Sequence, residues 1–164
     1  MKRSLRTFLI SAAGAWVFAS GTIHPSGAVK RASSSNALLS GTSISAEPLR
    51  IFERSCQNCH SDKTSWPWYS YLAPMSLMIE SDVSEARGRM NLSHWSEYSI
   101  EDRQSLLASI AAAVRSRQMP PSRYTLLHPD AKLSREERDL VYNWARGERR
   151  RLRAIDVTQP STGF

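Results

Sequence analysis

The sequence contains little cysteine, and this scarcity excludes several kinds of site. Cys56 and Cys59 are the only two cysteines in 164 residues. A structural zinc site would need two more Cys or His ligands at ligand spacing, and His94 and His128 lie too far apart in the sequence to form such a pair. A disulfide between cysteines three positions apart would close a tiny loop and constrain little of the chain.

Strand patterns and phosphate-binding loops are also missing from the sequence. No segment of any length alternates apolar and polar side chains, and no glycine-rich phosphate loop or nucleophile with a poised base is present. A thioredoxin-type dithiol would need a βαβ setting, which the helix and loop pattern around Cys56 does not provide. We therefore expect an all-α fold with four to five helices.

The two cysteines belong to the pentapeptide Cys-Gln-Asn-Cys-His at residues 56–60, which has the CxxCH pattern of covalent c-type haem attachment. Two thiols three positions apart on a helical turn face the same way, so both can add to the vinyl groups at one edge of a porphyrin. The adjacent His60 can offer a ring nitrogen to the iron. We predict one covalent haem c per chain, with dithiol, zinc and disulfide interpretations as alternatives.

Whether the iron has a second axial ligand from the protein distinguishes an electron-transfer protein from one that binds a ligand or catalyses a reaction. Methionine and histidine are the usual donors, and the candidates are Met75, Met78, Met90, Met119, His94 and His128. Met119 stands out because it precedes Pro120-Pro121, whose rigid backbone can hold a thioether in place. We predict His60 and Met119 as iron ligands, with one of the two histidines or an open position as alternatives.

The amino terminus has the pattern of a secretory leader. Basic residues at positions 2, 3 and 6 precede an apolar run from Phe8 to Ala19, which is too short for a comfortable membrane span. Residues 1–28 are therefore predicted to be a signal peptide or an amino-terminal membrane anchor, and cleavage stays an open question. We expect a periplasmic protein, either soluble or tethered to the membrane.

The rest of the chain divides into a linker, one domain and a tail. Residues 29–45 are rich in serine and other small residues without a sustained apolar period, which predicts a flexible linker. A cytochrome c-like haem-binding domain is expected over 46–153, followed by a disordered tail over 154–164. A chain of this length has room for one modest core, and we expect a monomer.

Apolar periodicity predicts the helices of this domain. They lie near 47–56, 75–90, 100–117 and 134–151. Capping boxes that start at Ser99 and Ser134 open the last two helices, and Pro120-Pro121 is expected to end the third. Residues 91–98 are predicted to be a connecting loop.

Aromatic residues and prolines cluster directly after the CxxCH pentapeptide. They are Trp66, Pro67, Trp68, Tyr69, Tyr71 and Pro74. Proline cannot lie inside a regular helix, so this segment is predicted to be a loop that wraps the haem edge. Any one aromatic side chain there fits an ordinary core position, but as a cluster we predict that Trp66, Trp68 and Tyr69 contact the haem and exclude water.

The charge is strongly positive and comes mainly from arginine. The net charge is +7; it falls to +4 without the three basic residues of the leader, and haem propionates would offset part of the remainder. We therefore predict no nucleic-acid partner. The dense run of Arg146, Arg149, Arg150, Arg151 and Arg153 indicates a solvated helix face, with docking of an acidic partner or anionic lipid as the weaker interpretation.

Several blocks recur in the order found in a known family. They are CQNCHS at 56–61, WPWYS at 66–70, Ala-Pro at 73–74, NLSHW at 91–95, Met-Pro-Pro at 119–121 and the segment 133–144. In these blocks the chain resembles a small bacterial haem-binding domain family with a single CxxCH, over about residues 49–151. The resemblance implies haem attachment and says little about a reaction.

A wider similarity to the class I cytochromes c implies a crossing of the first and last helices. On that analogy we pair Phe52 with Trp144. The Gly-Pro turn whose carbonyl orients the proximal histidine in class I is absent here, and Ala73-Pro74 is a candidate replacement. The hydrogen-bond partner of His60 therefore stays open.

These patterns together predict a periplasmic monohaem protein that transfers single electrons. They favour an electron carrier over an enzyme. Its redox partner is unknown. The alternative is a peroxidase-like haem enzyme or a redox or gas sensor with an open or labile sixth position, in which His94, His128 and Arg123 would be distal groups.

Overall fold

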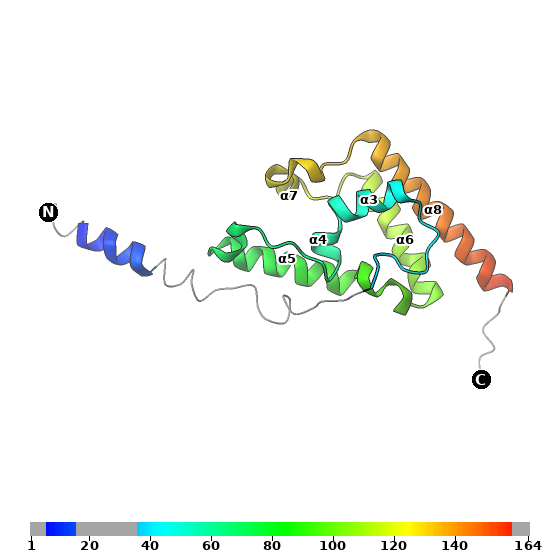
Figure 1. The fold of residues 1–164 in the computed structure, drawn as a ribbon, viewed down its shortest axis with the longest axis horizontal. Coiled ribbons are helices and arrows are strands. Elements are labelled where there is room, and N and C mark those ends of the chain that lie inside the picture. Colours follow the sequence, from blue (N-terminus) through cyan, green and yellow to red (C-terminus); the bar gives the residue numbers. More distant parts are fainter. Residues whose placement is uncertain (1–5, 16–35, 159–164) are drawn as a thin grey trace.

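The computed structural model describes residues 6–15 and 36–158, and in these ranges all regular structure is helical (Figure 1). The predicted all-α class is confirmed. Residues 6–15 form a helix with exposed side chains. The domain consists of α3 (Ala46–Ser55), α4 (Gln57–His60), η1 (Trp68–Tyr71), α5 (Met75–Arg89), η2 (Leu92–Glu97), α6 (Ile100–Arg115), α7 (Ser122–Leu127), η3 (Pro129–Ala131) and α8 (Arg135–Thr158).

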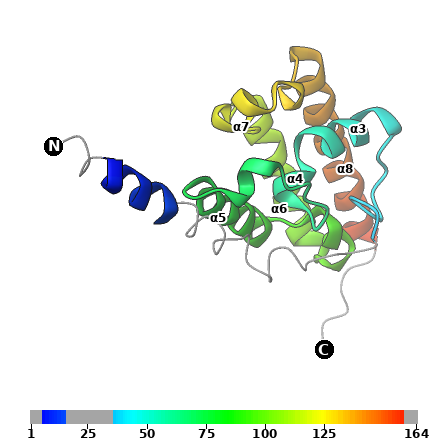
Figure 2. The same cartoon turned by 60° about the vertical axis from the view of Figure 1, so that its left-hand side comes forward.

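Helices α6 and α8 lie side by side and form the frame of the domain (Figures 1 and 2). Leu107 and Val114 of α6 and Val141 of α8 are almost completely buried between them, and Trp95 of η2 is fully buried in the same core. Burying one such side chain stabilises the fold by about 1.5 to 3 kcal/mol. This core supports the helices that carry the CxxCH pentapeptide.

The crossing of α3 and α8 is an aromatic contact. The rings of Phe52 and Trp144 meet edge to face, with centroids 5.1 Å apart and an interplanar angle of 74°. Phe52 is only 1% exposed, so this contact anchors α3 directly before the cysteines. The pairing expected from the likeness to class I cytochromes c is confirmed.

The predicted capping box at Ser134 is confirmed, and at Ser99 the hydroxyl caps the first turn of α6. The Ser99 hydroxyl accepts the backbone N–H of Asp102 at 3.0 Å. The Ser134 hydroxyl accepts the backbone N–H of Glu137 at 3.1 Å, and the Glu137 carboxylate accepts the N–H of Ser134 at 2.8 Å. These bonds satisfy backbone donors that the first turn of a helix leaves unpaired, which is why α6 and α8 begin where the sequence indicates.

Helix α6 ends at Arg115, two residues before the predicted end near 117 and well before Pro120-Pro121. Arg117 takes a left-handed conformation with φ of 61°. Its N–H donates to the carbonyl of Val114, while Gln118 and Met119 both donate to the carbonyl of Ala113. This is a Schellman-type ending, and it fixes the backbone of Met119 against the last turn of α6.

The predicted domain boundaries need correction at both ends. Leu38 and Leu39 are 8% and 1% exposed, and the Leu39 N–H donates to the Leu92 carbonyl at 3.0 Å, so part of the expected linker belongs to the core. Helix α8 runs to Thr158, so 154–158 are helical and not a disordered tail. Residues 1–5, 16–35 and 159–164, which hold most of the predicted leader, lie outside the described residues.

A buried carboxylate ties the segment 36–45, the strap, to α8. Glu148 is 3% exposed; its carboxylate accepts the Ser43 N–H at 3.3 Å and pairs with Arg151. Arg151 also donates to the Gly41 carbonyl, and the Trp144 indole N–H donates to the Ser43 carbonyl.

Among the described helices, none is both long and apolar enough to cross a membrane.

Replacing Phe52 by Ala should lower the free energy of unfolding by about 3 to 5 kcal/mol, because it leaves a cavity at the crossing of α3 and α8. Urea unfolding followed by circular dichroism measures this. Leu126 is 81% exposed, and Leu126→Ala should change the same quantity by less than about 0.5 kcal/mol. Equal losses in the two variants would contradict the role of the aromatic crossing.

Candidate functional site

A tight turn carries the two cysteines and His60. Helix α3 ends at Ser55, and Cys56, with φ of −125°, bends the chain into the single turn of α4. The backbone N–H groups of Cys59 and His60 both donate to the Cys56 carbonyl, at 3.3 and 3.0 Å. The Ser61 hydroxyl closes the turn by donating to the Gln57 carbonyl at 2.7 Å. The pentapeptide is therefore held rigidly by its own backbone.

The imidazole of His60 is oriented by the end of α5. Its Nδ1 lies 3.2 Å from the carbonyl oxygens of both Ala86 and Met90. A carbonyl can only accept, so Nδ1 carries the hydrogen and Nε2 keeps a free lone pair. Burial lowers the pKa of His60, although the hydrogen bonds to Met90 and Ala86 oppose that shift. The ring is therefore neutral and presents Nε2 as a donor to a metal.

These carbonyls answer the question about the partner of His60. Pro74 stands at the opposite end of α5, as the residue before its first turn. Ala73-Pro74 therefore does not replace the Gly-Pro carbonyl of class I cytochromes c. The last turn of α5 takes that role.

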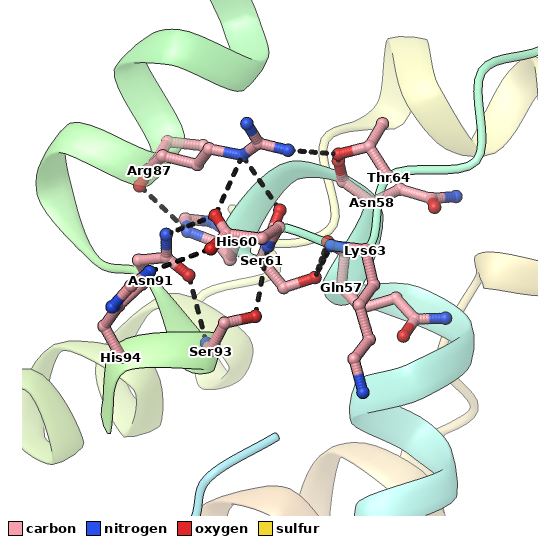
Figure 3. Close-up of polar contacts among 12 residues, drawn as sticks. Gln57, Asn58, His60, Ser61, Lys63, Thr64, Arg87, Asn91, Ser93 and His94 are labelled. Atoms are coloured by element: carbon pink, nitrogen blue, oxygen red, sulfur yellow. Dashed lines mark hydrogen bonds and ion pairs between the residues drawn. The ribbon is translucent and has the colours of Figure 1, made fainter. Parts of the chain in front are cut away.

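Arg87 holds the segment after the pentapeptide against α5. Its Nε donates to the Ser61 carbonyl at 2.8 Å, and its Nη2 donates to the Thr64 hydroxyl at 2.8 Å (Figure 3). The Arg87 side chain is only 11% exposed. Because Arg87 follows Ala86, one turn of α5 supplies both the acceptors for His60 and the clamp on the loop that follows it.

Asp62 links this loop to η2. Its carboxylate accepts from Asn91 at 2.8 Å and pairs with His94 Nε2 at 2.8 Å, while His94 Nδ1 lies 2.7 Å from Glu97. Burial alone would raise the pKa of Asp62, but the hydrogen bonds from Asn91 and His94 outweigh it and the pKa is lowered. The hydrogen bonds to Glu97 and Asp62 raise the pKa of His94.

These contacts correct the prediction for residues 91–98. The segment is the 3₁₀ helix η2 and not a plain loop. Both ring nitrogens of His94 are occupied by carboxylates, so His94 is poorly placed to ligate iron. The buried Asp62 that holds it has no recognisable signal in the sequence.

Most of the predicted site residues line one cavity. It measures about 300 Å³ and is lined by both cysteines, His60 and Met119, with Val114 of α6 and Leu133 among its apolar walls. Met119 is 39% exposed. Two thiols, an imidazole and a thioether on one largely apolar cavity are the donor set that c-type haem uses. The residues present therefore fit a haem.

A second, smaller cavity of about 140 Å³ adjoins the first and shares Cys59, Arg123 and Tyr124 with it. Trp66 and Tyr69 line this second cavity and not the one that Cys56, His60 and Met119 line. Trp68 is 75% exposed, which differs from the shielding predicted for it. It starts η1 directly after Pro67 and meets Tyr69 edge to face, with centroids 5.8 Å apart.

Tyr124 is a site residue that the sequence did not single out. Its ring stacks on His128 with centroids 4.4 Å apart, and its hydroxyl accepts from the Asn58 side chain at 3.0 Å. His128 Nε2 lies 2.5 Å from the Tyr69 hydroxyl. A single tyrosine on α7, a helix with no clear periodicity, gives no signal; only the fold brings it to Asn58.

Both cysteines are free thiols and are half-buried. Burial raises the pKa of Cys56 to about 12 and also raises that of Cys59. Reactive dithiols need the opposite, a lowered thiol pKa, so the thioredoxin-type interpretation loses support. In the described ranges no group of three or more His, Cys, Asp and Glu side chains could hold a metal ion.

Comparison with known proteins gives two matches. The haem-binding domain family matches residues 16–147. The chain is also similar to the cytochrome c peroxidase Ccp of Escherichia coli (strain K12), with 30% identity over 111 residues. That match covers 66% of this chain but 24% of the relative, so the chain spans about a quarter of that protein. No solved structure matches.

Arg87→Lys should lower the free energy of unfolding by about 1 to 3 kcal/mol, because one ammonium group cannot reach both the Ser61 carbonyl and the Thr64 hydroxyl. Urea unfolding measures the loss. Arg89 is two residues away with its side chain 75% exposed, and Arg89→Lys should cost less than about 0.5 kcal/mol. A similar, small cost for both variants would show that the clamp is weak.

Cys56 should alkylate very slowly in folded protein whose thiols are unmodified. With the pKa raised from 9.0 to about 12, its thiolate fraction at pH 8 is roughly 1000-fold below that of an ordinary thiol. Its rate should then rise about tenfold per pH unit from pH 8 to pH 11. Peptide mass spectrometry after iodoacetamide treatment measures it, with urea-unfolded protein as control. Equal rates in folded and unfolded protein would refute the raised pKa of Cys56.

Proposed function

The chain belongs to the haem-binding domain family, and from this membership we propose that it carries one haem c attached through Cys56 and Cys59, with His60 as proximal iron ligand. The observation that carries the proposal is the single cavity lined by both thiols, the imidazole and the Met119 thioether. Haem bound there would supply a one-electron couple at its iron. The protein's own residues set the conditions for that couple.

His60 is prepared for metal binding by hydrogen bonds to backbone carbonyls. The hydrogen on Nδ1 is held by the carbonyls of Ala86 and Met90 at the carboxyl end of α5. This end carries the negative pole of the helix dipole, so it increases the basicity of the ring. The same bonds fix the tautomer, and Nε2 needs no proton loss before it coordinates.

Met119 would be the second side chain that binds the iron in this proposal. The Schellman-type ending of α6 and the following Pro120-Pro121 restrict its backbone, and it lines the same cavity as His60. A thioether ligand raises the reduction potential relative to a second imidazole. Coordination by His60 and Met119 favours an electron carrier.

Two further observations support a carrier over a haem enzyme. Both nitrogens of His94 are held by carboxylates, and His128 Nε2 is engaged by Tyr69. Neither imidazole is therefore available for acid-base catalysis on a bound oxidant. The Escherichia coli relative is a peroxidase by name, but this chain spans only about a quarter of it.

We further propose that the protein works in the periplasm. Support comes from the basic and apolar pattern of residues 1–28, and from the attachment chemistry, since bacteria attach c-type haem outside the cytoplasm. The leader would be removed or would serve as a tether.

The test is spectroscopy of protein produced with the haem maturation machinery. Pyridine haemochrome should give a c-type spectrum whose haem resists acid-acetone extraction, and Cys56→Ser should weaken that attachment. Met119→Ala should convert a six-coordinate low-spin spectrum to high spin and lower the reduction potential by on the order of 0.1 V, within the roughly 0.8 V that axial ligands span.

Met78→Ala is the matched control, because Met78 is 51% exposed on α5 and is one of the other candidate methionines. Its spectrum should stay low spin. A low-spin spectrum retained in Met119→Ala would reject Met119 as ligand, and haem that is fully extractable would reject covalent attachment.

A further inference from the structure

A recess lined by arginines lies between α6 and α8, away from the cysteines. It measures about 460 Å³, and we call it the basic groove; it is lined by Leu107, Ala108, Ala111, Ala112, Arg115, Ser116, Tyr142, Arg146 and Arg149. Small alanine side chains line it on the α6 side, and arginines from both helices surround them. The cavity with Cys56 and His60 uses a different residue of α6, Val114.

Two of these arginines are held in place by one aromatic ring. The Arg115 guanidinium lies 4.7 Å from the centroid of Tyr142, and the Arg146 guanidinium lies 5.4 Å from it. Arg146 also donates to the Tyr142 hydroxyl at 3.2 Å. These contacts orient the guanidinium groups without neutralising their charge.

The arginines of the groove have little acidic compensation. In the part of the chain that the structure describes, Arg146 and Arg149 form no ion pair, and Arg149 Nε is buried without a hydrogen-bond partner. Arg115 reaches Asp139 only at 3.9 Å, with both side chains more than half exposed. By contrast Arg151, elsewhere on α8, is paired with Glu148.

Helical spacing extends this charge beyond the groove. Arg150 and Arg153 follow Arg146 and Arg149 at intervals of four, which places them on the same side of α8. Both are exposed, and no ion pair involves either of them in the described ranges. The groove therefore continues into a strip of arginines that form no ion pair among the described residues.

We propose that the basic groove docks an acidic segment of a partner protein. Carboxylates of the segment would pair with Arg146 and Arg149, and small side chains would enter between the helices above Ala111 and Ala112. A guanidinium presents a planar fork that binds carboxylates in two-point fashion. The groove supplies two such forks beside a narrow apolar wall.

The shape of this surface favours a protein segment over a membrane. A helix that lies on a bilayer presents a stripe of large apolar side chains. Among the described residues of α8, Val157 is the only large apolar side chain that is exposed. A flat layer of lipid headgroups would not reach the recessed alanines.

The docked segment would lie one helix away from the proposed haem. Val114 lines the haem cavity and the next residue, Arg115, lines the basic groove, and a helix with its side chains is about 10 to 12 Å across. Describing the partner as a redox partner rests on the proposed function. The binding itself does not.

The experiment titrates full-length, haem-loaded protein with poly-L-glutamate at low ionic strength, by isothermal titration calorimetry. Arg146→Gln/Arg149→Gln should raise the Kd roughly tenfold, because two desolvated charge pairs are lost. The control pair Arg50→Gln/Arg135→Gln removes the same charge from exposed positions on α3 and at the start of α8, and should change the Kd less than twofold. Thermal unfolding checks that both variants fold.

Equal weakening by the two variant pairs would overturn the proposal, since it would show attraction by net charge alone. Absence of poly-L-glutamate binding would overturn it as well. Vesicles containing phosphatidylglycerol form a separate arm. If Arg146→Gln/Arg149→Gln abolishes binding to the vesicles but leaves binding to poly-L-glutamate unchanged, the surface binds a membrane and the proposal is wrong. A missing haemochrome spectrum would refute the proposed function, and the same titration of the haem-free chain would then still test the docking.

Discussion

The hydrogen bond from His60 Nδ1 to the end of α5 is the constraint on which the site depends. It sets the tautomer and the direction of the ring, and it requires that α5 end next to the CxxCH turn. Arg87 secures that position from the same turn by holding the Ser61 carbonyl. Loosening either contact would leave His60 free to rotate, and a rotating imidazole is a poor axial ligand.

The cavity forms where two separately stabilised parts meet. On one side the CxxCH turn is fixed by α3, whose Phe52 packs on Trp144, and by the last turn of α5. On the other side the ending of α6 delivers Met119, since its N–H donates to the Ala113 carbonyl. Because α8 contacts both α3 and α6, it fixes the separation of the two walls without lining the cavity itself.

Local signals made most of the helices and the proximal site predictable. The capping boxes at Ser99 and Ser134 and the CxxCH spacing depend on neighbours within a few residues, so the sequence displays them. The acceptors for His60 were not predictable, because any backbone carbonyl looks alike in sequence. The ending of α6 was also missed, since Arg117 adopts the left-handed conformation that usually selects glycine. Leu38 and Leu39 were hidden among small residues typical of a linker.

The strap has a mechanical consequence. Any pull transmitted along the chain from before residue 36 reaches the bonds among Gly41, Ser43, Glu148 and Arg151 before it reaches α3. The load therefore passes into α8, the longest helix described. If the strap were loose, the same tension would act on α3 and, through Ser55, on the turn that carries Cys56 and His60. The contacts of Glu148 thus keep tension on the chain before residue 36 away from the turn that carries Cys56 and His60.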